Sequence, residues 1–115
     1  MIATSIWVNQ QRIAGNINVT IGKRNIYVDG EHITKDSKIC IFTQIKELKE
    51  IAYIDLIYTE INNIIVRDCK YFVIQDGCIN FMNKEDNLVA HVRLYDVEEL
   101  CVKTSDGVMF IADKQ

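Results

Sequence analysis

The 115-residue chain contains no proline and only five glycines. Average usage would give roughly five or six prolines in a chain of this length. Turns therefore have to be made by Asn, Asp and the few glycines. Proline-rich and Gly/Ser-rich linkers are excluded, and no charge block or low-complexity tract divides the chain. These absences predict a single domain over residues 1–115.

Long apolar runs are also missing. No stretch approaches the ~18 apolar residues that a membrane-crossing helix needs. The first residues, MIATSIWVNQ, lack the basic and apolar regions of a secretory signal. The net charge of −3 and the pI of 5.3 argue against duplex nucleic acid, because neutralising phosphates requires many Lys and Arg side chains. We expect a cytoplasmic protein that contacts neither a membrane nor nucleic acid.

Motifs that carry chemistry are absent as well. The chain has neither of the phosphate-binding patterns GxxxxGK[ST] and GxGxxG, nor the nucleophile-elbow pattern GxSxG. Its two histidines, His32 and His91, are far apart, whereas zinc sites normally use closely spaced pairs. A nucleophilic pair of Cys40 with His91 stays open as an alternative, since nearness in space is not visible in a sequence. We expect no enzymatic activity, no metal and no cofactor.

Four cysteines are present, but no two of them form a CxxC or another short pair. Cysteine is among the most buried residue types. We therefore expect buried free thiols, with a disulfide or a metal site as the alternatives. The cysteines are Cys40, Cys69, Cys78 and Cys101.

Isoleucine is abundant, with nineteen residues, while proline is absent. An excess of isoleucine, asparagine and lysine over proline and alanine is what AT-rich codon usage produces. Our hypothesis on origin is therefore an AT-rich genome, such as that of a low-GC bacterium, one of its phages or another AT-rich virus, in which the chain would be an accessory protein.

Much of the chain alternates apolar and polar residues with a period of two, the pattern of half-buried strands. The stretch FVIQDGCINF, residues 72–81, is typical of a β-hairpin with a two-residue type I′ turn, because Asp-Gly tolerates the positive φ that this turn requires. Asp29-Gly30 and Asp106-Gly107 lie in similar surroundings. The sequence predicts a hairpin at each of these three Asp-Gly pairs.

A two-residue turn also fixes which side chains share one face of a hairpin. Residues 72–81 should carry four large apolar side chains on one face, namely Phe72, Ile74, Ile79 and Phe81. The hairpin at Asp106-Gly107 should group Val102, Thr104, Met109 and Ile111.

Residues 44–58 fit both a helical and a strand pattern, and we expect a short helical turn near 44–50 followed by a strand. The chain as a whole predicts a mainly β fold: an antiparallel sandwich, or a partly open barrel, of hairpins with at most one short helix. The alternative is a β-solenoid, although the glycine content and regular period of stacked coils are missing.

Because the sequence has no motif for catalysis or phosphate binding, an interaction through the protein surface is the remaining function. Trp and Tyr are enriched at the centres of protein interfaces, which makes Trp7, Tyr53 and Tyr58 the candidate interface residues. The alternative for Trp7 is the core, where the single Trp of a small domain lies more often than at an interface. We expect a small non-enzymatic protein-interaction or assembly domain that binds a protein partner or a second copy of itself. The alternative is a β-barrel or sandwich that binds a small molecule.

Overall fold

The computed structural model describes residues 2–21, 26–33, 38–48, 55–105 and 107–114. Strands dominate these residues, as the alternating pattern predicts. The N-terminal strands are β1 (Ile2–Val8), β2 (Gln11–Ala14), β3 (Ile17–Ile21), β4 (Ile26–Val28), β5 (Glu31–Ile33) and β6 (Ile39–Gln44). The later strands are β7 (Leu56–Ile61), β8 (Ile64–Ile65), β9 (Tyr71–Gln75), β10 (Cys78–Met82), β11 (Leu88–Arg93), β12 (Glu99–Thr104) and β13 (Val108–Asp113).

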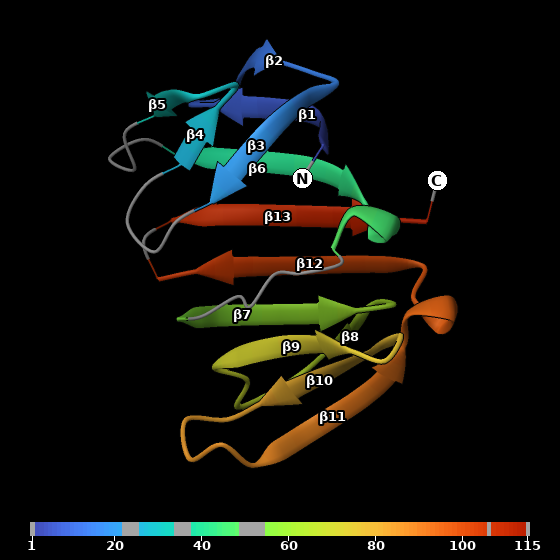
Figure 1. Cartoon of the computed structure of the whole chain (residues 1–115). Helices are drawn as coiled ribbons and strands as arrows, with labels where there is room; N and C mark the ends of the chain where they lie inside the picture. The colour runs from blue at the N-terminus through green and yellow to red at the C-terminus, as the bar shows by residue number, and fades with distance from the viewer. Residues whose placement is uncertain (1, 22–25, 34–37, 49–54, 106, 115) are drawn as a thin grey trace.

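The strands form two open sheets (Figure 1). The larger sheet has the order β5-β4-β3-β1-β6-β13-β12-β7-β8, with β2 paired to β1, and the smaller sheet has the order β11-β10-β9. The prediction of a mainly β, sandwich-like fold is confirmed, and the described strands do not stack as the coils of a solenoid. One pairing was not foreseen, because β13 lies parallel to β6 and joins the N-terminal strands to the C-terminal ones.

Helical structure is limited, within the described ranges, to the single 3₁₀ turns η1 (Ile45–Glu47) and η2 (Leu94–Asp96). The first confirms the helical turn predicted near 44–50, and β7 is the strand predicted after it; residues 49–54 lie outside the described ranges. No described helix has the length and apolar character needed to cross a membrane.

Two of the predicted Asp-Gly hairpins form as expected. Both residues of Asp29-Gly30 and of Asp76-Gly77 have positive φ, as a type I′ turn demands. In the second hairpin Ile74 pairs with Ile79 and Phe72 with Phe81. Asn62 and Asn63 have positive φ in the same way, so asparagine makes the β7–β8 turn without any glycine.

The third hairpin forms, but the predicted face was wrong. Lys103 pairs with Met109 and Val102 with Phe110, so the loop is one residue longer than a two-residue turn. A change of one residue in register moves side chains to the opposite face. Met109 and Ile111 consequently lie on the face opposite to Val102. The turn is stabilised by the Val108 N–H, which donates to the hydroxyl of Thr104 at 3.2 Å.

Cross-strand registers show how the middle of the large sheet builds the core. Two rows of paired residues cross β1, β6, β13, β12 and β7, and every member of both rows is buried. We call this the inner face. The first row consists of Ile6, Ile41, Phe110, Val102 and Thr59, and the second consists of Ala3, Thr43, Ala112, Leu100 and Ile61.

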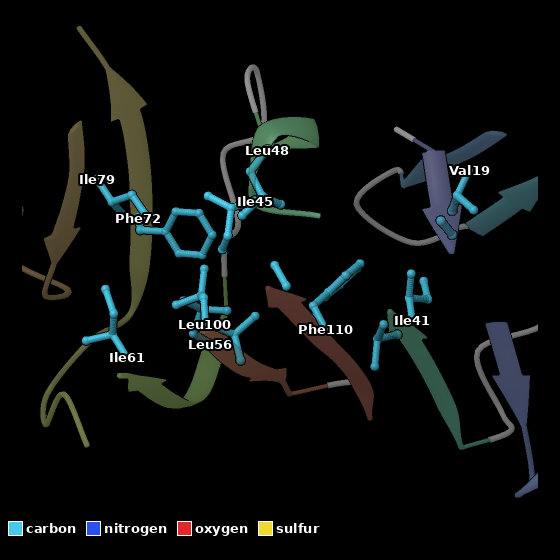
Figure 2. Close-up of a cluster of buried hydrophobic side chains, with 14 of the residues drawn as sticks. Val19, Ile41, Ile45, Leu48, Leu56, Ile61, Phe72, Ile79, Leu100 and Phe110 are labelled. Atoms are coloured by element: carbon cyan, nitrogen blue, oxygen red, sulfur yellow. The ribbon is translucent and has the colours of Figure 1, made fainter. Parts of the chain in front are cut away.

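The inner face is covered by three groups of side chains that belong with it to one buried cluster (Figure 2). Val19 and Ile26 come from β3 and β4. Ile45 and Leu48 come from η1 and the residue that follows it. The β9–β10 hairpin supplies the third group, which consists of Phe72, Ile79 and Phe81. The cluster leaves the opposite face of the same five strands outside the core.

Candidate interaction face

The opposite side of these five strands, which we call the outer face, carries two further cross-strand rows. Because directly paired residues point to the same side of a sheet, the registers define both rows. The first row consists of Trp7, Cys40, Met109, Lys103 and Tyr58. The second row consists of Ser5, Phe42, Ile111, Cys101 and Glu60.

The centre of the outer face is apolar. Phe42, Met109 and Ile111 meet there on the adjacent strands β6 and β13, flanked by Cys40 and Cys101. These five residues are half-buried, yet none of them belongs to the buried cluster or packs against it. When one face of a sheet is exposed to water, its strands normally alternate between apolar residues on the covered face and polar residues on the exposed face. An apolar centre on a face that none of the described segments covers is therefore a candidate interaction surface.

A groove opens at the Trp7 end of the outer face. Its volume is about 450 Å³, and Trp7, Cys40 and Met109 form its apolar wall. Lys38 and Lys103 stand at its rim, so the groove is apolar inside and positively charged outside. The remaining lining residues are Gln10, Ile39 and Gly107.

Charge is distributed unevenly along the strands of the outer face. Lys38 and Lys103 lie at the end where β6 begins and β12 finishes, and we call this the basic end. Glu60 lies in the second row, and Glu99 pairs with Asp113 beyond it, which makes the opposite end acidic. The Tyr58 hydroxyl donates a hydrogen bond to Glu60, and this hydrogen bond to a carboxylate raises the pKa of Tyr58.

Two of the three residues that the sequence nominated lie on this face, at opposite ends of one row. Trp7 is half-buried, and its indole N–H donates to the hydroxyl of Ser5 at 3.2 Å. Tyr58 is exposed. Tyr53 lies outside the described residues. The alternative that Trp7 is a core residue does not fit its position, because it is not part of the buried cluster.

Sequence reasoning missed the centre of the face, although a signal for it exists. The segments 39–42 and 108–112 are apolar at every position, so each strand has apolar side chains on both sides of the sheet. Such runs are typical of strands that are covered on both sides. Phe42 and Ile111 are these second-side residues.

The four cysteines are free thiols, and all are half-buried rather than fully buried as predicted. Burial raises the pKa of Cys40 and of Cys101, and the nearby carboxylate of Glu60 raises the pKa of Cys101 further. Cys40 and His91 lie in different sheets, and His91 instead contacts the amide oxygen of Asn80 at 2.5 Å. Among the described residues, no group of His, Cys, Asp and Glu is arranged to hold a metal.

We expect the thiols of the outer face to react slowly with iodoacetamide at pH 8. The thiolate is the reactive form, and a raised pKa keeps Cys40 and Cys101 protonated at this pH. Their alkylation rates should therefore be below that of glutathione at pH 8 and should rise as the pH passes above 9. Peptide mass spectrometry over a pH series measures each rate separately. Rates that level off below pH 8 would contradict this expectation.

Comparisons with protein-family models, with characterised proteins and with solved structures each gave no match to this chain.

Proposed function

We propose that the chain is a non-enzymatic assembly domain that binds a second copy of itself through the outer face. The observation that supports this proposal most directly is the apolar centre formed by Phe42, Met109 and Ile111 on a face that no described segment covers. Covering these side chains with an equivalent face would remove apolar surface from water, which is the main driving force of protein association. On this proposal the two large sheets would pack against each other through their outer faces, in the middle of a four-layer assembly.

The charge distribution favours a second copy over an unrelated partner. A twofold axis that runs across the strands, parallel to the sheet, turns one copy end over end. The basic end with Lys103 then meets the acidic end of the partner copy, with Glu60 and Glu99. In the described part of the chain neither Lys103 nor Glu99 forms an ion pair, so both charges are available for such a contact. A twofold axis along the strands would instead oppose equal charges.

The size of the face fits a small homodimer interface. Five strands of about six residues cover roughly 24 Å by 20 Å at normal strand spacing and rise, or about 480 Å² of flat area. A standard interface buries about 800 Å² of accessible surface per partner, which exceeds the flat area because side chains protrude. The self-complementary contact is the arrangement that twofold dimers use.

Complementary charge reversal tests the arrangement. The variant Lys38→Glu/Lys103→Glu makes both ends of the outer face acidic, and Glu60→Lys/Glu99→Lys makes both ends basic. Each variant alone should associate about 30-fold more weakly than the wild type, because like charges meet twice in the dimer. An equimolar mixture should associate as well as the wild type, within about threefold. Sedimentation velocity across a concentration series measures all three samples.

The outcomes separate the parts of the proposal. A wild-type protein that stays monomeric up to about 1 mM would contradict self-association itself. A dimer that is insensitive to both double variants would show that another surface or another twofold axis is used. If each double variant by itself associates weakly and their equimolar mixture associates as the wild type does, the end-over-end arrangement is identified.

The cellular setting is part of the proposal and rests on the sequence. Four free thiols suit a reducing compartment such as the cytoplasm. The isoleucine-rich, proline-free composition suits an accessory protein of a phage or a low-GC bacterium. The alternative function, small-molecule binding, is favoured by a second cleft that lies at the edge of the large sheet.

A further inference from the structure

This second cleft lies beside β7 and has a volume of about 500 Å³. It exists because residues 66–70 arch away from β7 between two fixed points. Val66 donates its N–H to the carbonyl of Thr59 at 2.9 Å, and Leu56 donates its N–H to the carbonyl of Lys70 at 2.8 Å. The size falls within the ~300–1,000 Å³ range of small-molecule sites.

Positive charge dominates the cleft. Arg67, Lys70 and Lys84 line it together with one acidic residue, Asp68. Lys70 contacts Asp55 at 3.5 Å, and Lys84 contacts the neighbouring Glu85 at 4.0 Å. Arg67 forms no ion pair with a described residue, so its planar guanidinium group remains available to an oxyanion.

A buried hydroxyl group in the same cleft lacks a partner. Thr59 lines the cleft and is 1% exposed, and its Oγ1 has no hydrogen bond within the described structure. Burial raises the pKa of the Cys69 thiol, and the neighbouring Thr59 hydroxyl offsets part of this rise, but the geometry between the two groups does not make a hydrogen bond. Buried polar groups are nearly always satisfied, so an orphaned hydroxyl points to an acceptor that a ligand supplies.

Besides these groups and Tyr58, the cleft has an apolar part of its lining. Ile57 and Ile65 are 60% and 50% exposed, and Leu56 is buried behind them. A bare inorganic anion would leave these side chains in water. A ligand with an apolar body would cover them while its charged group meets the cations.

We propose that this cleft binds a small organic oxyanion, a phosphate or carboxylate group carried on an apolar body. The charged group lies among Arg67, Lys70 and Lys84, and one of its oxygens accepts a hydrogen bond from Thr59. The apolar body rests on Ile57 and Ile65. Of the lining residues, Tyr58 also ends the first row of the outer face, but none of Phe42, Met109 and Ile111 lines this site.

Titration of the ¹⁵N-labelled protein with phenyl phosphate, benzoate, inorganic phosphate and phenol tests the proposal by NMR. We expect phenyl phosphate or benzoate to shift the amide signals of residues 56–59 and 65–70. Inorganic phosphate should bind at least about tenfold more weakly, and phenol should bind as weakly or more so. If only phenyl phosphate or only benzoate binds, the charged group of the ligand is assigned as a phosphate or as a carboxylate, respectively. If neither binds, or if phenol binds as tightly as they do, the proposal is wrong.

Two variants assign the binding to the named groups. Arg67→Ala should weaken binding about tenfold, because charge-assisted hydrogen bonds are the strong ones. Arg93→Ala, which removes an exposed arginine of the small sheet that pairs with Asp96, is the matched control and should bind as the wild type does. Thr59→Val keeps the shape of the side chain and removes only the hydroxyl. It should weaken binding severalfold while its denaturation midpoint is at least that of the wild type, because an unsatisfied hydroxyl is lost. Unchanged binding in both Arg67→Ala and Thr59→Val would overturn the assignment.

Discussion

Replacing Ile111 with glutamate is expected to convert the self-associated protein into a folded monomer. Ile111 lies on the outer face between Phe42 and Cys101, on the middle strand of the five. In the dimer the new carboxylate would be desolvated without a cation beside it, and Glu60 lies in the same row. Burying an unpaired charge costs about 3 kcal/mol or more, so the dissociation constant should rise roughly 100-fold. Sedimentation velocity measures this change.

Val73→Glu is the matched control for this variant. Val73 is also a half-buried β-branched residue on a strand, but it lies in the small sheet and pairs with Asn80. It should leave the dissociation constant within about threefold of the wild type. Circular dichroism must show both variants folded. If both variants dissociate equally, or neither does, the outer face is not the interface.

Truncating Phe72 to alanine should have the largest effect on stability. Phe72 is 0% exposed, and its ring lies 5.7 Å from that of Phe81, between the small sheet and the inner face. Phe→Ala substitutions in cores cost about 3–5 kcal/mol, a large part of a stability of roughly 5–15 kcal/mol. Urea denaturation measures the loss. The Ile111→Glu background is best for this experiment, because association adds a concentration-dependent term to the apparent stability.

Two further variants make the result interpretable. Tyr95→Ala removes an aromatic ring that is 80% exposed and whose centroid lies 4.9 Å from the ammonium group of Lys114. It should cost less than about 1 kcal/mol. Phe72→Leu, expected to cost roughly 1–2 kcal/mol, remains measurable if the alanine variant does not fold. A loss below about 1 kcal/mol for Phe72→Ala would contradict the placement of this ring in the core.

The parts of the fold that follow from neighbouring residues could be predicted, and the parts that join distant segments could not. The geometry of the Asp76-Gly77 turn is determined by its own two residues, so the pairing of Phe72 with Phe81 could be predicted from residues 72–81 alone. The third Asp-Gly pair, of which Asp106 lies outside the described residues, stands in a connection that is one residue longer according to the strand register, and no local signal distinguishes the two cases. The parallel pairing of β13 with β6 had no local signal at all.

The candidate site divides in the same way. Trp7 and Tyr58 could be nominated from residue type alone, but only the strand order shows that they end the same row. Phe42 and Ile111 are indistinguishable in sequence from core residues, because their strands are apolar on both sides. The cleft beside β7 depends on an arching segment and an orphaned hydroxyl, Thr59, which no sequence pattern reveals.

The position of β13 between β6 and β12 also has a consequence for the kinetics of folding. The pairing of Ile39 with Val108 can form only after Val108 has been synthesised. The two halves of the large sheet therefore cannot join until nearly all of the described chain has left the ribosome. Contacts between such distant residues make folding slow, because a long loop has to close before they form. Until then β6 presents a free, apolar strand edge. The interval between synthesis of β6 and arrival of β13 is therefore the period in which the nascent chain is most prone to aggregate.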